Sequence, residues 1–178
     1  FPPEVEEEAD AWKAKYGKED KLKGRRDFSE VTTFTIDTAD AKDFDDALSV
    51  RTLPNGNTEV GVHIADVSHF VRPGTTLDNE ARKRATSVYL VDRTIPMLPH
   101  VLSTDLCSLN PNEDRLAVSA IFELDSNGGI VSRSFGPTVI HSDKRFAYEE
   151  AQEVLDKNEG PLLEELLTLR TLAWQIRE

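Results

Sequence analysis

Residues 34–50, FTIDTADAKDFDDALSV, place a dense group of acidic side chains between two apolar segments. The flanking residues, VTTFTI (31–36) and ALSVRTL (47–53), are rich in β-branched residues and predict strands. Ten residues between them hold five aspartates: Asp37, Asp40, Asp43, Asp45 and Asp46. We therefore expect a strand, an acidic loop and a returning strand, with several carboxylates meeting at one end.

Two common structures explain this acidic segment less well. Four of the aspartates are spaced by three, as on one face of a helix, but the flanks are poor helix formers and like charges at that spacing repel. An EF-hand calcium loop starting at Asp37 needs acidic or amide residues at its third and fifth positions and glycine at its sixth. The sequence has Ala39, Ala41 and Lys42 there.

A third alternative is the Asp-x-Asp motif of metal-dependent nucleotide-sugar transferases, which Asp43-Phe44-Asp45 matches over only three residues. A metal-ion site explains more of the pattern, because crowded carboxylates raise one another's pKa and a hard cation relieves the repulsion. Strand alternation would point Asp46 away from Asp43 and Asp45, so these ligands require a loop or bulge.

Composition limits the possible classes of protein. The 178 residues are 38% hydrophobic and carry a net charge of −12, which argues against broad electrostatic binding of nucleic acid by this chain alone. No apolar run approaches the roughly 20 residues that cross a bilayer, so no membrane is expected. The single cysteine, Cys107, fits a reducing cytoplasm and is interpreted as a buried hydrophobe. A start at Phe1 is interpreted as that of a fragment.

The remaining pattern predicts an α+β fold: a mixed, largely antiparallel sheet with hairpins packed against helices. Two hairpins are expected, 47–53 with 58–67 around Asn55-Gly56, and 113–125 with 130–140. Val60, Val62 and Ile64 should share one face. Helices are expected over 4–16, ending near Gly17, and over 75–90, 147–157 and 161–177, with loops over 17–30 and 91–103. We divide the chain into an N-terminal helix and linker, residues 1–23, and a domain from 24 to 178.

Several long motifs resemble the RNB catalytic domain of the ribonuclease II and ribonuclease R family. They are GRRDF (24–28), TIDTADAKDFDDALSV (35–50), GVHIADVSHFV (61–71), VYLVDRTIPMLPHVLSTDLCSLNP (88–111), DRLAVSAIFELDSNG (114–128) and SDKRFAYEEAQEVL (142–155). The resemblance covers residues 24 to 157, corresponding to the N-terminal half of that domain, and is closer to ribonuclease R.

This resemblance implies a processive, Mg²⁺-dependent 3′-to-5′ exoribonuclease that hydrolyses RNA to nucleoside 5′-monophosphates, with Mn²⁺ as a possible substitute. By position, Asp37 and Asp46 correspond to metal ligands. Asp43 and Asp45 correspond to further ligands or catalytic, water-orienting carboxylates, with Asp45 the most critical. Tyr89 corresponds to the tyrosine that packs on the 3′-terminal nucleotide of single-stranded RNA. Without the resemblance, Tyr89 is interpreted as a core tyrosine at a helix end.

The family also has features that lie beyond this sequence. A catalytic arginine, a second base-stacking aromatic residue, flanking oligonucleotide-binding domains and an S1 domain are expected downstream or on either side. We therefore expect the isolated chain to be inactive and to self-associate through exposed sheet edges. The alternative is a catalytically inactive RNA-binding or regulatory module with the same fold.

Four other polar residues are assigned by their sequence context. Asp66 is interpreted as an indirect support of the site and His69 as structural. Asp105 and Arg115 are interpreted as hydrogen-bond partners that fix a loop.

Overall fold

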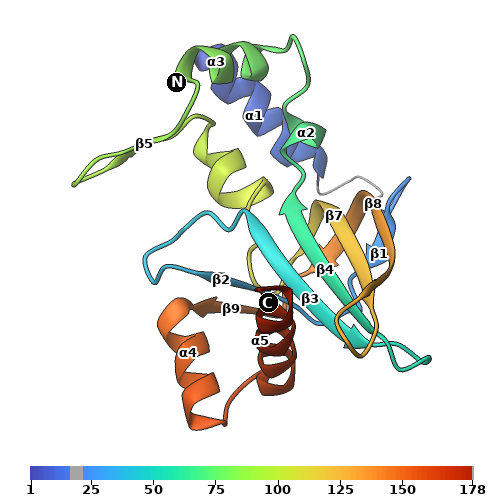
Figure 1. Ribbon diagram of the computed structural model, residues 1–178. Helices are drawn as coiled ribbons and strands as arrows, with labels where there is room; N and C mark the ends of the chain where they lie inside the picture. Colours follow the sequence, from blue (N-terminus) through green and yellow to red (C-terminus); the bar gives the residue numbers. More distant parts are fainter. Residues whose placement is uncertain (17–21, 178) are drawn as a thin grey trace.

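A curved seven-stranded sheet forms the centre of the computed structural model, which describes residues 1–16 and 22–177 (Figure 1). Within that part of the chain the strand order is β1-β8-β7-β4-β3-β2-β9. The strands are β1 (Arg26–Phe28), β2 (Thr33–Asp37), β3 (Asp46–Thr52), β4 (Thr58–Ala65), β7 (Asp114–Leu124), β8 (Ile130–His141) and β9 (Lys144–Ala147).

The two predicted hairpins, β3–β4 and β7–β8, are confirmed, and β4 joins them by pairing antiparallel with β7. Gly56 has φ +85° in the first turn, a conformation that glycine adopts without steric cost. The short edge strands differ, because β1 runs parallel to β8 and β9 runs parallel to β2. The sheet is thus mixed and largely antiparallel, as the sequence predicts.

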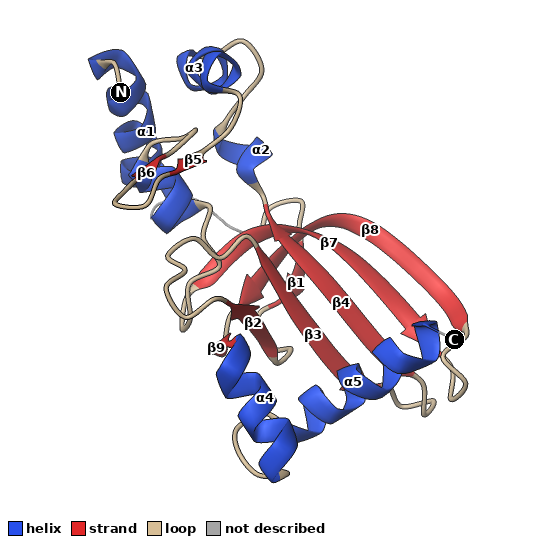
Figure 2. Cartoon of the chain, turned by 60° about the vertical axis from the view of Figure 1, so that its left-hand side comes forward, coloured by secondary structure: helices blue, strands red, loops and turns tan. Residues whose placement is uncertain are grey.

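Helices gather at two ends of the sheet (Figure 2). Helix α1 (Pro3–Tyr16) packs with α2 (Val67–Phe70) and α3 (Thr76–Arg84) in one apolar cluster. Helices α4 (Tyr148–Lys157) and α5 (Leu163–Arg177) lie against β2, β3 and β9 in a second cluster, where the rings of Phe34 and Phe146 meet edge to face at 5.8 Å. These helices confirm the predictions for 4–16, 147–157 and 161–177, although Gly17 lies outside the described residues.

The buried face of β4 is the one with fewer hydrophobic side chains. Val60, Val62 and Ile64 share a face as predicted, but that face is partly exposed. The opposite face is buried because the sheet curves around it. The polar groups on that face are paired. There the fully buried His63 lies 2.6 Å (Nδ1) from Ser119 Oγ and 2.9 Å (Nε2) from Ser49 Oγ.

The helix predicted over 75–90 is too long. Helix α3 ends at Arg84, Ala85 adopts φ +63°, and the chain forms the hairpin of β5 (Val88–Tyr89) and β6 (Thr94–Ile95). This hairpin is held at its base by two hydrogen bonds, from the Arg84 guanidinium to Pro96 O and from Met97 N to Ser87 Oγ. These tertiary bonds outweigh the helical propensity of the segment.

Two predicted loops also contain regular structure. The segment 17–30 includes β1, because Arg26–Phe28 find backbone partners in β8. The segment 91–103 contains β6 and the start of η1 (Leu102–Leu106), a single π-helical turn. Strand β1 depends on contacts with a distant strand, and η1 is a rare type of helix. Neither feature follows from local composition.

Candidate active site

The acidic segment is a loop between two antiparallel strands. Asp37 is the last residue of β2, Asp46 is the first of β3, and residues 41–45 have no regular secondary structure. This arrangement confirms the predicted strand–loop–strand and excludes the helical alternative for the aspartates. It also confirms that Asp43 and Asp45 lie in a loop rather than in a regular strand. We call residues 38–45 the aspartate loop.

Asp37 carries the clearest sign of a missing partner. Its side chain is half-buried, and Oδ2 is a buried atom that has no hydrogen-bond partner among the described residues. Burial is the main cause that raises the pKa of Asp37 above its ordinary value, and the charges of Asp46 and Asp43 raise it further. The Thr35 hydroxyl and the positive charge of Arg145 act in the opposite direction and offset only part of this rise in pKa. An unsatisfied buried carboxylate oxygen is costly, so this position favours a bound cation.

Asp45 lies in a similar electrostatic environment. Asp45 is exposed as a whole residue, but partial desolvation of its carboxylate raises its pKa, and the charges of Asp43, Asp46 and Asp37 add to the shift. The loop backbone is fixed at this point, because Ala65 N donates to Asp45 O at 2.9 Å. Neighbouring aspartates therefore help to raise the pKa values of both Asp37 and Asp45, which is the crowding that a divalent cation relieves.

The donor chemistry fits Mg²⁺, but these residues do not form a preformed cage. Within residues 1–16 and 22–177, no three acidic, histidine or cysteine side chains converge closely enough to hold a metal ion by themselves. Mg²⁺ is usually held by one or two carboxylates together with waters and substrate phosphates. The carboxylate oxygens and the orphaned Asp37 Oδ2 match that mode of binding.

Tyr89 lies beside the aspartate loop on the β5–β6 hairpin. Its side chain is 69% exposed, and its hydroxyl donates to Asp43 Oδ2 at 3.4 Å. The negative charge of Asp43 is the main reason that the pKa of Tyr89 is raised. The interpretation as a core tyrosine at a helix end is therefore wrong, and the exposed ring is free to stack on a ligand.

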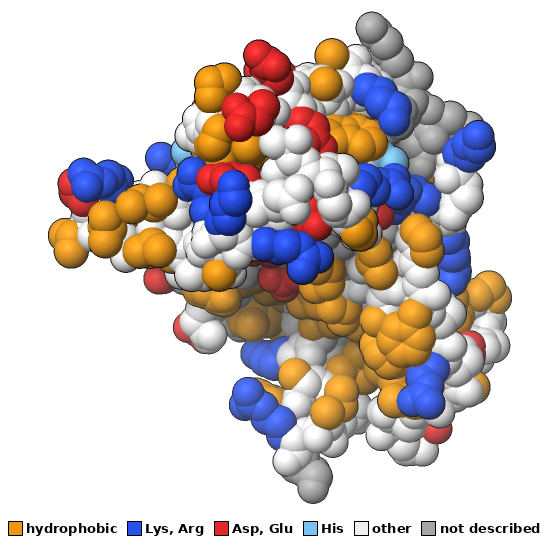
Figure 3. Space-filling view, turned by 90° about the horizontal axis from the view of Figure 1, so that it is seen from above, with side chains coloured by type: hydrophobic (Ala, Val, Ile, Leu, Met, Phe, Trp, Pro, Cys, Tyr) orange, Lys and Arg blue, Asp and Glu red, His pale blue; other side chains and the backbone are white. Residues whose placement is uncertain are grey.

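Two clefts flank the aspartate loop. One, of about 510 Å³, is lined by Asp43, Tyr89 and Arg93 among others, and the second, of about 430 Å³, includes Asp46 and Tyr148. The hairpin above the first cleft projects from the body of the molecule and shows hydrophobic side chains along its length (Figure 3).

Arg145 is a residue at the site to which the sequence assigns no role. From β9 its guanidinium donates to Thr38 O at 2.7 Å and to Ala39 O at 2.9 Å, and it lies 5.5 Å from the Phe44 ring centroid. It thus ties the start of the aspartate loop to the sheet edge. In the sequence, Arg145 is marked only by its place in the motif SDKRFAYEEAQEVL. Its position beside the aspartate loop depends on the pairing of β2 with β9.

The other assigned residues take part in contacts outside the aspartate loop. Asp66 pairs with Arg25 at 2.5 Å and caps α2 through His69 N, and its interpretation as an indirect support of the site stays a prediction. Arg115 pairs with Asp105 at 3.2 Å, which confirms their loop-fixing role. Cys107 is buried, and burial raises its pKa to about 12, as expected of a structural cysteine.

Comparison with known proteins agrees with this arrangement. The model of the RNB domain family matches residues 25–178. Ribonuclease R of Thermotoga maritima is 53% identical over 156 residues, which are 88% of this chain and 22% of that protein. The chain thus spans about a fifth of the length of this relative.

Solved structures show the same fold. The RNase R of Mycoplasma genitalium in complex with ribose-methylated single-stranded RNA superposes with a TM-score of 0.79 at 31% identity, covering 96% of this chain and 27% of that one. The yeast pseudonuclease Ssd1 superposes with a TM-score of 0.77 at 28% identity, covering 88% of this chain and 19% of that one.

The chain belongs to the RNB domain family. Its N-terminal helix α1 precedes the matched region, and the aspartate loop, Tyr89 and Arg145 all lie within it. In the described residues, no helix combines the length and apolarity needed to cross a membrane.

Proposed function

We propose that this chain forms the metal-binding part of the active site in a hydrolytic, processive 3′-to-5′ exoribonuclease that degrades single-stranded RNA to nucleoside 5′-monophosphates. The orphaned, buried Asp37 Oδ2, set among other aspartates, is the observation that carries the proposal. The RNB family match and the ribonuclease R relative support it.

Each side chain then has a distinct task. Asp37 and Asp46 would hold the cation from the ends of β2 and β3, and Asp43 and Asp45 would complete the site or orient the attacking water. Mg²⁺, or Mn²⁺ in its place, supplies charge to stabilise the phosphate in the transition state and makes bound water more acidic. Water attacks phosphorus, and the bond to the 3′ oxygen of the preceding nucleotide breaks. That oxygen takes a proton to become a hydroxyl, and the terminal nucleotide leaves as a 5′-monophosphate.

Tyr89 would bind the terminal nucleotide. An exposed aromatic ring stacks on any base, since every base presents a π face, so it positions the 3′ end without reading its sequence. The hydroxyl contact with Asp43 sets the ring beside the aspartate loop. Flanking oligonucleotide-binding and S1 domains would supply the basic surface that a chain of net charge −12 does not provide, in a cytoplasmic protein.

The decisive experiment compares the unsubstituted protein with Asp45→Asn, each at the full length of the ribonuclease R relatives. We expect the unsubstituted protein to release mononucleotides from 3′-labelled single-stranded RNA in Mg²⁺, and Asp45→Asn to retain RNA binding but lose hydrolysis. Hydrolysis by Asp45→Asn at the unsubstituted rate would contradict the assignment. The 178-residue chain alone should give no mononucleotides, because the expected catalytic arginine lies downstream.

The second candidate is an inactive RNA-binding or regulatory module. The similarity to the pseudonuclease Ssd1 favours it, because this fold persists there without nuclease activity. This alternative predicts RNA binding that Mg²⁺ does not convert to degradation at any chain length. The same RNA assay therefore separates the two functions.

A further inference from the structure

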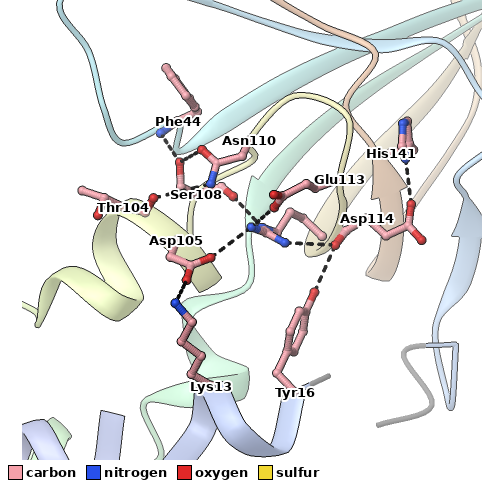
Figure 4. Close-up of polar contacts among 11 residues, drawn as sticks. Lys13, Tyr16, Phe44, Thr104, Asp105, Ser108, Asn110, Glu113, Asp114 and His141 are labelled. Atoms are coloured by element: carbon pink, nitrogen blue, oxygen red, sulfur yellow. Dashed lines mark hydrogen bonds and ion pairs between the residues drawn. The ribbon is translucent and has the colours of Figure 1, made fainter. Parts of the chain in front are cut away.

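The middle of the aspartate loop is anchored by a segment far along the chain. Phe44, which lies between Asp43 and Asp45 in the sequence, has a buried side chain. Its N–H donates to Ser108 Oγ at 2.9 Å (Figure 4). Its carbonyl oxygen accepts a hydrogen bond of 2.8 Å from Leu109 N. Both backbone polar groups of Phe44 are thus held by two consecutive residues, Ser108 and Leu109, which lie 64 and 65 positions away from it.

The Ser108 hydroxyl is fixed in the orientation that accepts this bond. Ser108 is fully buried, and its single hydroxyl proton is donated to Asn110 Oδ1 at 3.1 Å (Figure 4). The oxygen lone pairs are therefore left for the Phe44 N–H. A buried hydroxyl committed on both sides has little freedom to rotate.

The segment that carries Ser108 is itself rigidly supported. It follows the π-helical turn η1, which Cys107 N closes by donating to Leu102 O at 2.8 Å. The buried Arg115 donates from Nε to Ser108 O at 2.9 Å and pairs with Asp105 and Glu113. Single π-helical turns occur frequently at functional sites.

We infer that Ser108 is a positioning residue for the candidate metal site, acting through the backbone of Phe44. Because Asp43 and Asp45 are the two neighbours of Phe44, fixing that one residue restricts both carboxylates at once. Without the anchor, cation binding has to order the loop as well as neutralise it. This inference rests on the proposed function, since it assumes that the aspartates bind a divalent cation.

The experiment measures Mn²⁺ affinity of the 178-residue chain by calorimetry and amide hydrogen exchange of residues 38–45. Ser108→Ala is compared with the unsubstituted chain and with Ser119→Ala. Ser119 is an apt control because it is also a buried, hydrogen-bonded serine, but it lies in the His63 network. Unfolding midpoints in chelator show the general loss of stability in each variant.

We expect Ser108→Ala to weaken Mn²⁺ binding about 10-fold, as removal of groups that orient metal ligands commonly does. It should also speed exchange at the Phe44 amide, while Ser119→Ala changes neither. If Ser108→Ala folds poorly, Asn110→Ala leaves the hydroxyl in place but frees its rotation, and it should give a smaller loss of affinity in the same direction.

Three results would overturn the inference. Unchanged Mn²⁺ affinity in Ser108→Ala contradicts the positioning role while leaving the proposed function intact. Equal losses in Ser108→Ala and Ser119→Ala show a general effect of destabilisation instead. Absence of Mn²⁺ binding by the unsubstituted chain contradicts the proposed metal site, and the inference fails with it.

Discussion

The hydroxyl of Tyr89 donates to the carboxylate of Asp43 at 3.4 Å, across 46 residues of sequence. This contact joins the exposed β5–β6 hairpin to the aspartate loop. It places an aromatic surface for a base next to the acidic groups proposed to act on the adjoining phosphate. Binding and chemistry would therefore meet at the boundary between two separate elements of the fold.

Tyr89→Ala is expected to weaken binding of single-stranded RNA by about 5- to 150-fold, since base stacking contributes about 1–3 kcal/mol. Fluorescence anisotropy with a 5′-labelled oligonucleotide in Ca²⁺, at the length of the relatives, measures the change. Tyr89→Phe is the matched control, because it keeps the ring and loses only the contact with Asp43. Equal affinities for Tyr89→Ala and the unsubstituted protein would exclude stacking.

Asp37→Asn should stabilise the metal-free chain at neutral pH. Since the folded-state pKa of Asp37 is raised, folding takes up a proton between the ordinary value of 3.8 and the raised value. The contribution of this group to stability therefore falls as the pH rises through that window and stays low above it. Urea unfolding in chelator should show the variant to be more stable than the unsubstituted chain at pH 7.

The difference between these two chains should shrink as the pH is lowered towards 4, because Asp37 then becomes protonated and neutral. Saturating Mg²⁺ should reverse the order at pH 7, since asparagine is the weaker ligand and bound metal stabilises the folded state. An unsubstituted chain that is more stable in chelator at pH 7 would show that the Asp37 carboxylate is already satisfied.

Arg145→Ala is expected to lower the free energy of unfolding by on the order of 1–2 kcal/mol, because it removes two charged hydrogen bonds to the aspartate loop. Hydrogen exchange should accelerate at residues 38–41. Arg133→Ala, an exposed arginine of β8, serves as the control and should change neither quantity. Similar effects from both substitutions would indicate that net charge, not the loop contact, is responsible.

His63 should make the chain sensitive to mild acid. Burial lowers its pKa from 6.5 to about 4, so the unfolded chain binds a proton that the folded chain excludes between these values. The stability contributed by neutral His63 is present above pH 6.5 and is lost as the pH falls towards 4, by about 3 kcal/mol at most.

The measurement is the free energy of unfolding between pH 4 and 7 for the unsubstituted chain and His63→Gln. Glutamine keeps hydrogen-bonding capacity but does not titrate in this range. The variant should therefore show a flatter pH dependence and a lower stability at pH 7. Parallel curves for the two chains would contradict a buried neutral histidine.

Local patterns predicted a large part of this fold. The Asn55-Gly56 hairpin, the β7–β8 hairpin and the amphipathic C-terminal helices follow from turn chemistry and periodicity within short windows. The same reasoning failed for Tyr89, because the choice between helix and hairpin there depends on two bonds across the segment: Arg84 donates to Pro96 O, and Met97 N donates to Ser87 Oγ.

The sequence by itself determined the family and the order of strand, acidic loop and strand, because both are encoded in contiguous residues. Only the tertiary structure decided which face of β4 is enclosed, and that Arg145 and Ser108 hold the aspartate loop at its start and its middle. The Ser108 and Arg145 contacts join segments 64 and 107 residues apart. Side-chain periodicity reports a residue's own strand or helix, whereas these contacts depend on the register between distant elements.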